Sequence, residues 1–320
     1  MKLHGLGYIG LTAPDPGSLL SFWTDIVGMM PARALPGEDR GNPIDPGSGP
    51  VSGGSGMAAD GSIYLKMDDY QWRIAVHPGE QPGLAYLGFE VQDDIALTEA
   101  MAEVASAGVQ ITRGTPVDAS ARGVVGLAWC TDPYGNRVEL FYGPVHDRNF
   151  VSPTQTEFKT GELGLGHALM FVDNAESGLR FYMGVLGFKR SDFITVGPGL
   201  AGHFLRCTPR HHSVALMNIG PVNMLNHVMV EVVSLDQVGA ALDRASDAGI
   251  TITRSLGRHL NDETVSFYMQ SPAGFEVEVG WDAVIVDDAT WCDHEAAGNE
   301  IWGHKLQAVT GIETLSRSQP

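Results

Sequence analysis

Cysteine is scarce in this chain. Only three of its 320 residues are cysteines, and Cys130, Cys207 and Cys292 show no paired spacing. This argues against a disulfide framework or a zinc–thiolate site, and it suits a reducing cytoplasm, where we expect the protein to act. Basic residues are also few, with 20 Lys and Arg against 38 Asp and Glu and a net charge of −18. Binding to a phosphate backbone needs clustered positive charge, so we expect no nucleic-acid partner.

Long hydrophobic runs and nucleotide-binding motifs are absent as well. No window approaches 18 consecutive apolar residues, so we expect neither a membrane-spanning helix nor a membrane partner. The opening MKLHGLGYIGL is too short and too interrupted by glycine to predict a secretion signal. Neither GxxxxGK[ST] nor a strand-linked GxGxxG occurs, so nucleotide binding has no support. Apolar residues still make up 43% of the chain, which is ample for two domains with cores.

The chain contains an internal duplication. The segments GLGYIGL, LAYLGFEV and NRVELFYG of the first half match GLGHALMFV, LNHVMVEV and GFEVEVGW of the second. The offset falls from 159 residues between Tyr8 and His167 to 140 between Trp72 and His212. Several matches in register favour a true repeat. The drop in offset places extra residues in the first half, at the Gly-, Pro- and Ser-rich segment 36–61, which we interpret as a mobile loop.

Each half has the pattern of a strand, a helix and several further strands. GHALMFV and HVMVEVV are rich in strand-forming residues, whereas 97–107, 174–186 and 236–248 favour helices. The turns DPYG and SPAG each precede a final strand. The pattern predicts an α+β fold of repeated βαβββ modules, two in each of two domains. The expected ranges are 1–146 for the first domain, 147–162 for a linker, 163–290 for a catalytic domain and 291–320 for a C-terminal tail.

Histidines distinguish the second half from the first. His167 and His227 stand where the first half has Tyr8 and Tyr86, and a glutamate, Glu278, follows on a third strand. Two imidazoles and one carboxylate on one face of a metal ion leave open positions, as in non-haem Fe(II) enzymes, although zinc hydrolases use the same ligand types. A single histidine in an apolar strand is more often a core residue. The placement in one copy of a repeat nevertheless favours one metal site per chain.

The carboxylate ligand stays open at this point. Glu276 and Glu278 share one face of a strand by the period of two, and the alignment of Glu278 with Glu139 does not decide between them. His211 alternates with His212, so we interpret it as a neighbour of the site. The remaining histidines form no constellation and are expected to be structural or on the surface: His4, His77, His146, His203, His294 and His304.

These motifs resemble those of the type I extradiol ring-cleaving catechol dioxygenases of the vicinal oxygen chelate superfamily. The resemblance covers nearly the whole chain. Its most specific segments are GLGHALMFV, TPRHHSVALM, NHVMVEV and SLGRHLNDETVSFYMQSPAGFEVEVGW, and IWGHK near the end is similar too. It implies a vicinal oxygen chelate (glyoxalase-like) fold, a first domain without metal and a homo-oligomer. It also implies Fe(II), with Mn(II) as the less favoured metal, and O₂ as co-substrate.

The resemblance further implies roles for individual residues. Position by position, the implied iron ligands are His167, His227 and Glu278. The implied acid/base residue is His212, and His259 and Tyr268 are implied to contact the substrate or its oxygens. Alone, His259 could stabilise a loop and Tyr268 a strand. The residues expected near the substrate, which could equally pack a core or form a turn, are Leu169, Phe204, Asn261 and Asp262.

The implied reaction inserts both atoms of O₂ into a catechol and gives a 2-hydroxy-6-oxo-dienoate in aromatic catabolism. We expect a bicyclic or larger substrate such as 2,3-dihydroxybiphenyl, with a steroid-derived catechol or 1,2-dihydroxynaphthalene as alternatives. A glyoxalase-type isomerase or epimerase usually needs further carboxylate ligands. A non-catalytic protein that binds aromatic ligands would not need His212, His259 and Tyr268 together.

Overall fold

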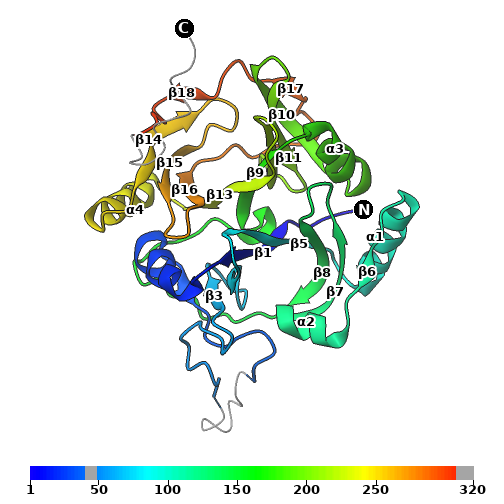
Figure 1. Ribbon diagram of the computed structural model, residues 1–320, viewed down its shortest axis with the longest axis vertical. Coiled ribbons are helices and arrows are strands. Elements are labelled where there is room, and N and C mark those ends of the chain that lie inside the picture. Colours follow the sequence, from blue (N-terminus) through cyan, green and yellow to red (C-terminus); the bar gives the residue numbers. More distant parts are fainter. Residues whose placement is uncertain (40–48, 308–320) are drawn as a thin grey trace.

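The computed structural model describes residues 1–39 and 49–307. Two curved sheets lie one above the other, the first below and the second above in Figure 1, with helices on their outer sides. Strands dominate and helices are few, which confirms the predicted α+β class. No helix in these ranges is long and apolar enough to span a membrane. The cysteines described are all free.

The first sheet has eight strands in the order β2-β3-β4-β1-β5-β8-β7-β6 among the described residues. At its centre, β1 runs parallel to β4 and antiparallel to β5, which in turn runs parallel to β8. The strands are β1 (Leu6–Ala13), β2 (Met30–Pro31), β3 (Ile63–Lys66), β4 (Ile74–Pro78), β5 (Gly83–Glu90), β6 (Thr112–Arg113), β7 (Val124–Thr131) and β8 (Arg137–Pro144).

The second sheet repeats this centre. Strand β9 is parallel to β12 and antiparallel to β13, and β13 is parallel to β16. The register repeats as well, since Tyr86 pairs with Arg137 in the first sheet and His227 with Glu276 in the second. The strands are β9 (Gly166–Val172), β10 (Lys189–Gly197), β11 (Leu200–Arg206), β12 (Val214–Asn218), β13 (Met224–Glu231), β14 (Ile252–His259), β15 (Val265–Gln270), β16 (Glu276–Trp281), β17 (His294–Glu295) and β18 (Glu300–Trp302).

Two long helices cover the outer sides of the sheets. Helix α1 (Asp94–Ser106) begins after Asp93, and α4 (Leu235–Asp247) begins after Ser234; each of these side chains accepts a hydrogen bond from a backbone N–H of the first turn. Both lie where the sequence predicts helices. The predicted helix 174–186 is α3 (Ala175–Leu179) continued by a π-helix, Arg180–Val185, and the first half has a π-helix at Phe22–Val27. Short 3₁₀ turns occupy Pro16–Leu19 and Gly161–Leu163.

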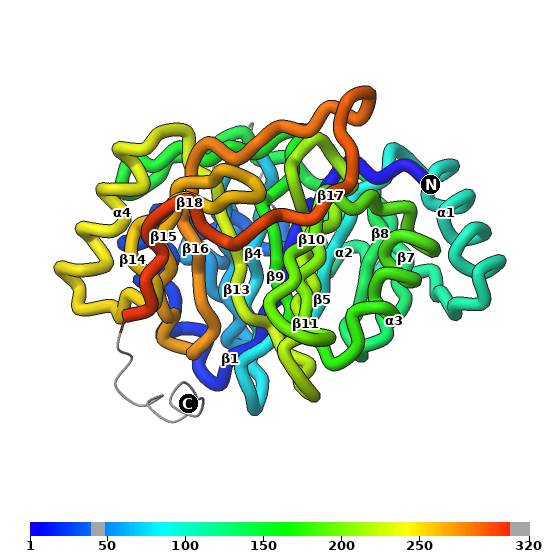
Figure 2. Tube along the Cα trace, turned by 90° about the horizontal axis from the view of Figure 1, so that it is seen from above, coloured from blue at the N-terminus to red at the C-terminus, as the bar shows by residue number. Residues whose placement is uncertain are grey.

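The segment predicted as a tail beyond residue 290 contributes strands to the second sheet. Strand β17 pairs with β10 and β18 pairs with β14, at opposite edges of that sheet. Figure 2 shows this orange and red part of the chain leaving β16, running across the sheet to β17 and returning to β18. One chain segment therefore links both edges of the second sheet.

The two halves differ after their long helices. In the first half, β6 has only two residues and is followed by α2 (Pro116–Arg122). Thr115 caps this helix by a reciprocal capping box with Asp118, and Pro116 is preorganised for the first turn. In the second half the same region is the eight-residue strand β14. The longer strand provides the edge on which β18 pairs.

The predicted loop 36–61 is described only at its two flanks, because residues 40–48 lie outside the described residues. The flanks are joined by the Glu38 carboxylate, which accepts hydrogen bonds from the N–H groups of Leu35 (2.8 Å) and Ser52 (2.6 Å). The hydroxyl of Ser52 donates to the carbonyl of Arg33 at 3.1 Å. Glu38 and Ser52 thus connect the two flanks of the insertion to each other and to the residues that follow β2.

Candidate metal centre and active site

Three buried side chains converge at the centre of the second sheet. His167 lies on β9, His227 on β13 and Glu278 on β16, which are three neighbouring strands. Nε2 of His167 is 3.0 Å from Nε2 of His227, and each of these atoms is 3.3 Å from Oε2 of Glu278. The register brings them together because Met229 of β13 pairs with both His167 and Glu278.

These distances fit a shared metal ion. Bonds of about 2.1 Å, separated by the angles of an octahedron or a tetrahedron, place neighbouring ligand atoms about 3.0–3.4 Å apart. Burial lowers the pKa of His167, which favours a neutral imidazole with a free lone pair. Burial alone would raise the pKa of Glu278, but its contacts with the imidazoles of His167, His227 and His259 outweigh burial and hold the pKa well below its usual range. An anionic carboxylate and two imidazoles are a suitable donor set for a divalent cation.

Asn226 decides between the two carboxylates that the sequence left open. Nδ1 of His227 is 2.7 Å from Oδ1 of Asn226, so the imidazole donates from Nδ1 and its Nε2 lone pair points into the cluster. The amide nitrogen of Asn226 then donates to Oε2 of Glu276 at 3.2 Å. Glu276 therefore supports His227 from behind, while Glu278 faces the histidine pair.

His212 lies directly over His167. Their ring centroids are 3.9 Å apart, and Phe204 packs edge-on against the other side of His212 at 5.0 Å. Burial, with His167 nearby, lowers the pKa of His212 well below its ordinary value, so this imidazole is neutral. Nδ1 of His212 is 3.2 Å from Nδ1 of His211 and 3.9 Å from a carboxylate oxygen of Asp262. His211 is fully buried behind it, as predicted for a neighbour.

His259 and Tyr268 form a second polar group on the other side of the cluster. Nε2 of His259 is 2.8 Å from Oη of Tyr268 and 3.4 Å from Oε1 of Glu278. Burial alone would lower the pKa of His259, but the carboxylates of Glu278, Glu300 and Asp262 outweigh it and raise the pKa well above the ordinary value. Burial and the charge of Glu278 raise the pKa of Tyr268, which keeps the phenol protonated.

Glu300 and His304 also reach this group, although nothing in the sequence analysis placed them there. Oε2 of Glu300 is 3.2 Å from Nδ1 of His259, and it also contacts Nδ1 of His304. The His304 ring lies over that of His259 with centroids 4.1 Å apart. His304 is buried, so its interpretation as a surface or isolated structural histidine was wrong in placing it outside any constellation. The available signal was the IWGHK motif.

A cavity of about 230 Å³ is bordered by the three clustered side chains His167, His227 and Glu278 and by His212, His259, Tyr268 and Glu300. One wall is apolar and the other is the polar cluster. Asn261 offers a buried side-chain nitrogen that has no hydrogen-bond partner within the described part of the chain. The four residues expected near a substrate, Leu169, Phe204, Asn261 and Asp262, all line the cavity. The remaining apolar lining residues are Phe171, Ile194, Met217 and Ile219.

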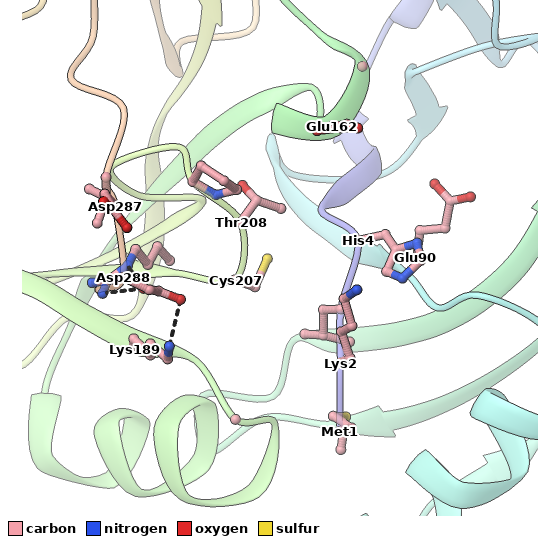
Figure 3. Close-up of a pocket in the computed structure, with 16 residues that line it drawn as sticks. Met1, Lys2, His4, Glu90, Glu162, Lys189, Cys207, Thr208, Asp287 and Asp288 are labelled. Atoms are coloured by element: carbon pink, nitrogen blue, oxygen red, sulfur yellow. Dashed lines mark hydrogen bonds and ion pairs between the residues drawn. The ribbon is translucent and has the colours of Figure 1, made fainter. Parts of the chain in front are cut away.

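A second and larger cavity, of about 830 Å³, lies apart from this chemistry. Figure 3 shows the N-terminal residues Lys2 and His4 facing Cys207 and Asp288 across it. Two of its cations are paired with the same carboxylate, because Nζ of Lys189 and Nη2 of Arg206 are 2.6 and 2.8 Å from oxygens of Asp288. Burial raises the pKa of the Cys207 thiol to about 12, which makes it a poor nucleophile. None of the predicted site residues lines this cavity.

Comparisons with known proteins agree with the geometry. The model of the Glyoxalase/Bleomycin resistance protein/Dioxygenase superfamily matches residues 5–140 and 164–279. The chain is 37% identical over 312 residues to a biphenyl-2,3-diol 1,2-dioxygenase of Paraburkholderia xenovorans, covering 95% of this chain and 96% of the relative. It is 33% identical to an iron-dependent extradiol dioxygenase of Rhodococcus jostii, covering 95% and 97%.

Solved structures give the same result. The crystal structure of a halotolerant catechol dioxygenase superposes with a TM-score of 0.84 at 34% identity, and the match covers 95% of each chain. The resemblance seen in the motifs is thereby confirmed. The chain belongs to the Glyoxalase/Bleomycin resistance protein/Dioxygenase superfamily and, within it, to the family of the extradiol dioxygenases.

Proposed function

We propose that this protein is an Fe(II)-dependent extradiol dioxygenase that opens the ring of a substituted catechol, with both atoms of O₂ entering the product. One observation carries the proposal: a buried His–His–carboxylate cluster, made by His167, His227 and Glu278, shares one cavity with two separate proton-handling groups. A binding protein would need neither of these groups. The ligand types suit Mn(II) as well, so the choice of Fe(II) rests on the iron-dependent relative.

Fe(II) held by these three residues would supply a Lewis acid for the catechol oxygens and a route for electrons to O₂. The chain's own residues handle the protons. His259 and Tyr268, linked at 2.8 Å, lie beside Glu278 and are placed to bind and orient a catechol oxygen. The carboxylates around His259 favour its imidazolium form, which stabilises that oxygen when its proton leaves. His212 lies on the opposite side, over His167. Its neutral imidazole can donate an N–H hydrogen bond to charge that develops on oxygen, and after taking up a proton released by the catechol it can return that proton to the oxygen.

The apolar wall suits a substrate with a second ring. Leu169, Phe204 and Ile194 belong to one hydrophobic cluster that borders the cavity and excludes water from the polar side. Asn261 and Asp262 add polar groups to the same cavity, with a carboxylate oxygen of Asp262 3.9 Å from Nδ1 of His212. We therefore propose a bicyclic catechol such as 2,3-dihydroxybiphenyl, in agreement with the substrate in the name of the Paraburkholderia relative.

Anaerobic loading with Fe(II), followed by 2,3-dihydroxybiphenyl and air, tests the reaction. We expect stoichiometric O₂ uptake together with a yellow ring-cleavage product. Iron binding without O₂ uptake on any of 2,3-dihydroxybiphenyl, 1,2-dihydroxynaphthalene or simple catechols would overturn the proposal and point to a binding protein. Loading with Mn(II) in parallel identifies the metal that supports turnover.

Values of kcat/KM for catechol, 3-methylcatechol, 2,3-dihydroxybiphenyl and 1,2-dihydroxynaphthalene test the choice of substrate. We expect the biphenyl to be preferred over unsubstituted catechol. The reverse order would contradict the assignment of the apolar wall while leaving the reaction itself intact.

We also propose that residues 163–290 form the main part of the catalytic domain, which β17 and β18 complete. Residues 1–146 are proposed to bind no metal, with 147–162 as the linker. The protein is proposed to act in the cytoplasm as a homo-oligomer. Light scattering of the purified chain measures its mass in solution, and a monomer would contradict the oligomer.

A further inference from the structure

We infer that Glu300, on the C-terminal strand β18, is a positioning residue that holds the imidazole of His259 in its working orientation. The inference rests on the proposed ring-cleaving function, because His259 has a role only in that reaction. Glu300 lies in residues 291–320, the segment that the sequence analysis assigned to a C-terminal tail outside the catalytic domain.

The contacts of His259 are divided between its two nitrogens. Nδ1 is 3.2 Å from Oε2 of Glu300 and 3.4 Å from the backbone oxygen of Asn299. Nε2 faces the metal cluster, 2.8 Å from Oη of Tyr268 and 3.4 Å from Oε1 of Glu278. A carboxylate that binds Nδ1–H fixes the ring, so that Nε2 points at the cavity. Without it, the ring can turn and present its other edge.

The register of the sheet places Glu300 for this purpose. Strand β18 pairs antiparallel with β14, and Glu300 stands directly opposite His259. The backbone N–H of Leu260 donates to the carbonyl of Asn299 at 2.9 Å, which holds the pair in register. Side chains directly opposite in an antiparallel pair point to the same face. The Glu300 carboxylate therefore lies beside the His259 imidazole on the same face of the sheet.

His304 contacts the same carboxylate oxygen as His259. Its Nδ1 contacts Oε2 of Glu300, and its Nε2 is 3.0 Å from the carbonyl oxygen of Ser266. The close approach of this segment to β14 requires glycine. A Cβ on Gly303 would lie 2.2 Å from the carbonyl oxygen of Leu256, and one on Gly257 would lie 2.3 Å from the backbone nitrogen of His304. Two imidazoles therefore contact the Glu300 carboxylate, and the close packing of the backbone at Gly257 and Gly303 keeps His304 near it.

Three single variants test the inference in the iron-loaded protein with 2,3-dihydroxybiphenyl. Glu300→Ala should lower kcat by about tenfold or more with KM changed less than about threefold, because misorientation of a reacting group acts on the chemical step. Glu300→Gln keeps an oxygen that accepts from Nδ1–H, so it should retain kcat within about threefold. Glu295→Ala, an exposed carboxylate on β17, is the matched control and should change neither parameter.

A double-mutant comparison separates positioning from a general structural effect. In a His259→Ala background, Glu300→Ala should leave kcat unchanged, because the group through which Glu300 acts is gone. Multiplicative losses in the double variant would overturn the inference, as would equal losses in Glu300→Ala and Glu300→Gln. Where Glu300→Ala loses its fold or its iron, Glu300→Met, which keeps the side-chain length without an acceptor, replaces it in both comparisons.

The wild-type protein in the same assay keeps the two proposals apart. An inactive wild type overturns the proposed function. An active wild type whose Glu300 variants match it, or whose losses persist without His259, overturns only the positioning role. Coupled loss in Glu300→Ala, with rescue by Glu300→Gln, supports both.

Discussion

The centres of the two sheets hold the same glutamate in different surroundings. Glu139 on β8 and Glu278 on β16 occupy equivalent register positions, opposite Trp129 and Tyr268 on the neighbouring antiparallel strands. Both carboxylates are buried. The two glutamates differ in the groups that compensate their charge.

Guanidinium groups compensate Glu139. Arg122 donates to both of its oxygens, at 2.9 and 3.0 Å, and Arg137 donates at 2.7 Å. The hydroxyl of Tyr8, which stands where the second sheet has His167, donates at 2.6 Å. The remaining volume is filled by aromatic rings, with Tyr8 stacked on Phe141 at 4.5 Å between centroids. In the first centre, arginine side chains therefore neutralise the carboxylate and aromatic rings take the space beside it.

Imidazoles replace these groups around Glu278. His167 and His227 contact the carboxylate at 3.3 Å, and a cavity lies where the first sheet has aromatic rings. Burial holds the His167 pKa low, so the imidazole brings no fixed positive charge. A buried carboxylate without a fixed cation attracts an external one. Both copies of the repeat thus have the carboxylate, but its charge is compensated by arginines in the first copy and, as we propose, by a metal ion in the second.

Removal of Glu278 should have the largest effect, because it takes the carboxylate out of the metal-binding centre while the first centre keeps its own. Glu278→Ala takes away a proposed ligand, and we expect kcat/KM to fall by about 10³-fold or more, beyond the ~10–100-fold typical when a residue supporting a ligand is lost. Bound iron per chain, measured by metal analysis after gel filtration, should fall in parallel. Glu276→Ala removes the neighbouring carboxylate on the same strand and should retain measurable iron. Equal iron in Glu278→Ala and wild type would contradict the ligand assignment.

Replacement of the equivalent glutamate in the first sheet should affect stability instead of iron binding. Glu139→Gln leaves Arg122 without its buried carboxylate, and we expect about 3 kcal/mol of destabilisation, the lower end for a broken buried ion pair because Arg137 is partly exposed. The midpoint of urea unfolding measures this effect. Iron per folded chain should stay at the wild-type value.

Glu176→Gln provides the matched control for that variant. It breaks an ion pair with Arg180 in which both side chains are largely exposed, so the unfolding midpoint should not move. A Glu139→Gln protein as stable as wild type would show that the guanidinium groups of the first centre do not depend on their carboxylate.

His212 marks the second chemical difference, since the first sheet has Trp72 at this position. His212→Ala should keep iron and still bind catechol anaerobically, but turnover should fall by about 10²-fold or more with the loss of the acid/base group. His294→Ala, on the exposed strand β17, is the histidine control. Turnover at the wild-type rate in His212→Ala would exclude the proposed role.

Much of this contrast could be predicted from the sequence, because both halves share a register that survives as motif matches. The alignment placed Tyr8 against His167 and Glu139 against Glu278, and the paired strands confirm that frame. It could not separate Glu276 from Glu278, since residues two apart in a strand share a face. The structure separates them, because Glu278 contacts both histidines while Glu276 accepts from Asn226.

Other features were missed for distinct reasons. The contacts of Glu300 and His304 with His259 depend on the pairing of β18 with β14, across about 40 residues of chain. The IWGHK motif marks the segment but does not say which strand it pairs with. Helix α2, by contrast, was visible in principle, because TPVD carries the capping box that Thr115 and Asp118 form. The hydrogen bonds of a π-helix span one residue more than those of an α-helix, and over six residues this difference is too small for apolar periodicity to reveal.

Asn226 provides a smaller test of the imidazole arrangement. Asn226→Ala removes the acceptor at 2.7 Å from Nδ1 of His227, and we expect iron affinity to fall by about tenfold, the lower end for a residue that orients a ligand. Competition with a chelator measures the affinity. Asn223→Ala, a nearby asparagine whose side chain accepts from the backbone of Asp173, is the control. Unchanged affinity in Asn226→Ala would mean that the sheet alone orients His227.

Transfer of the histidines to the first sheet should have the smallest effect. Tyr8→His with Tyr86→His restores two imidazoles beside Glu139, but Arg122 and Arg137 still occupy both carboxylate oxygens. In a Glu278→Ala background, where any iron must bind elsewhere, we therefore expect no iron per chain by metal analysis. Iron bound stoichiometrically by that triple variant would show that histidines suffice. Iron that appears only after Arg122→Met is added would identify the guanidinium as the group that closed the first centre.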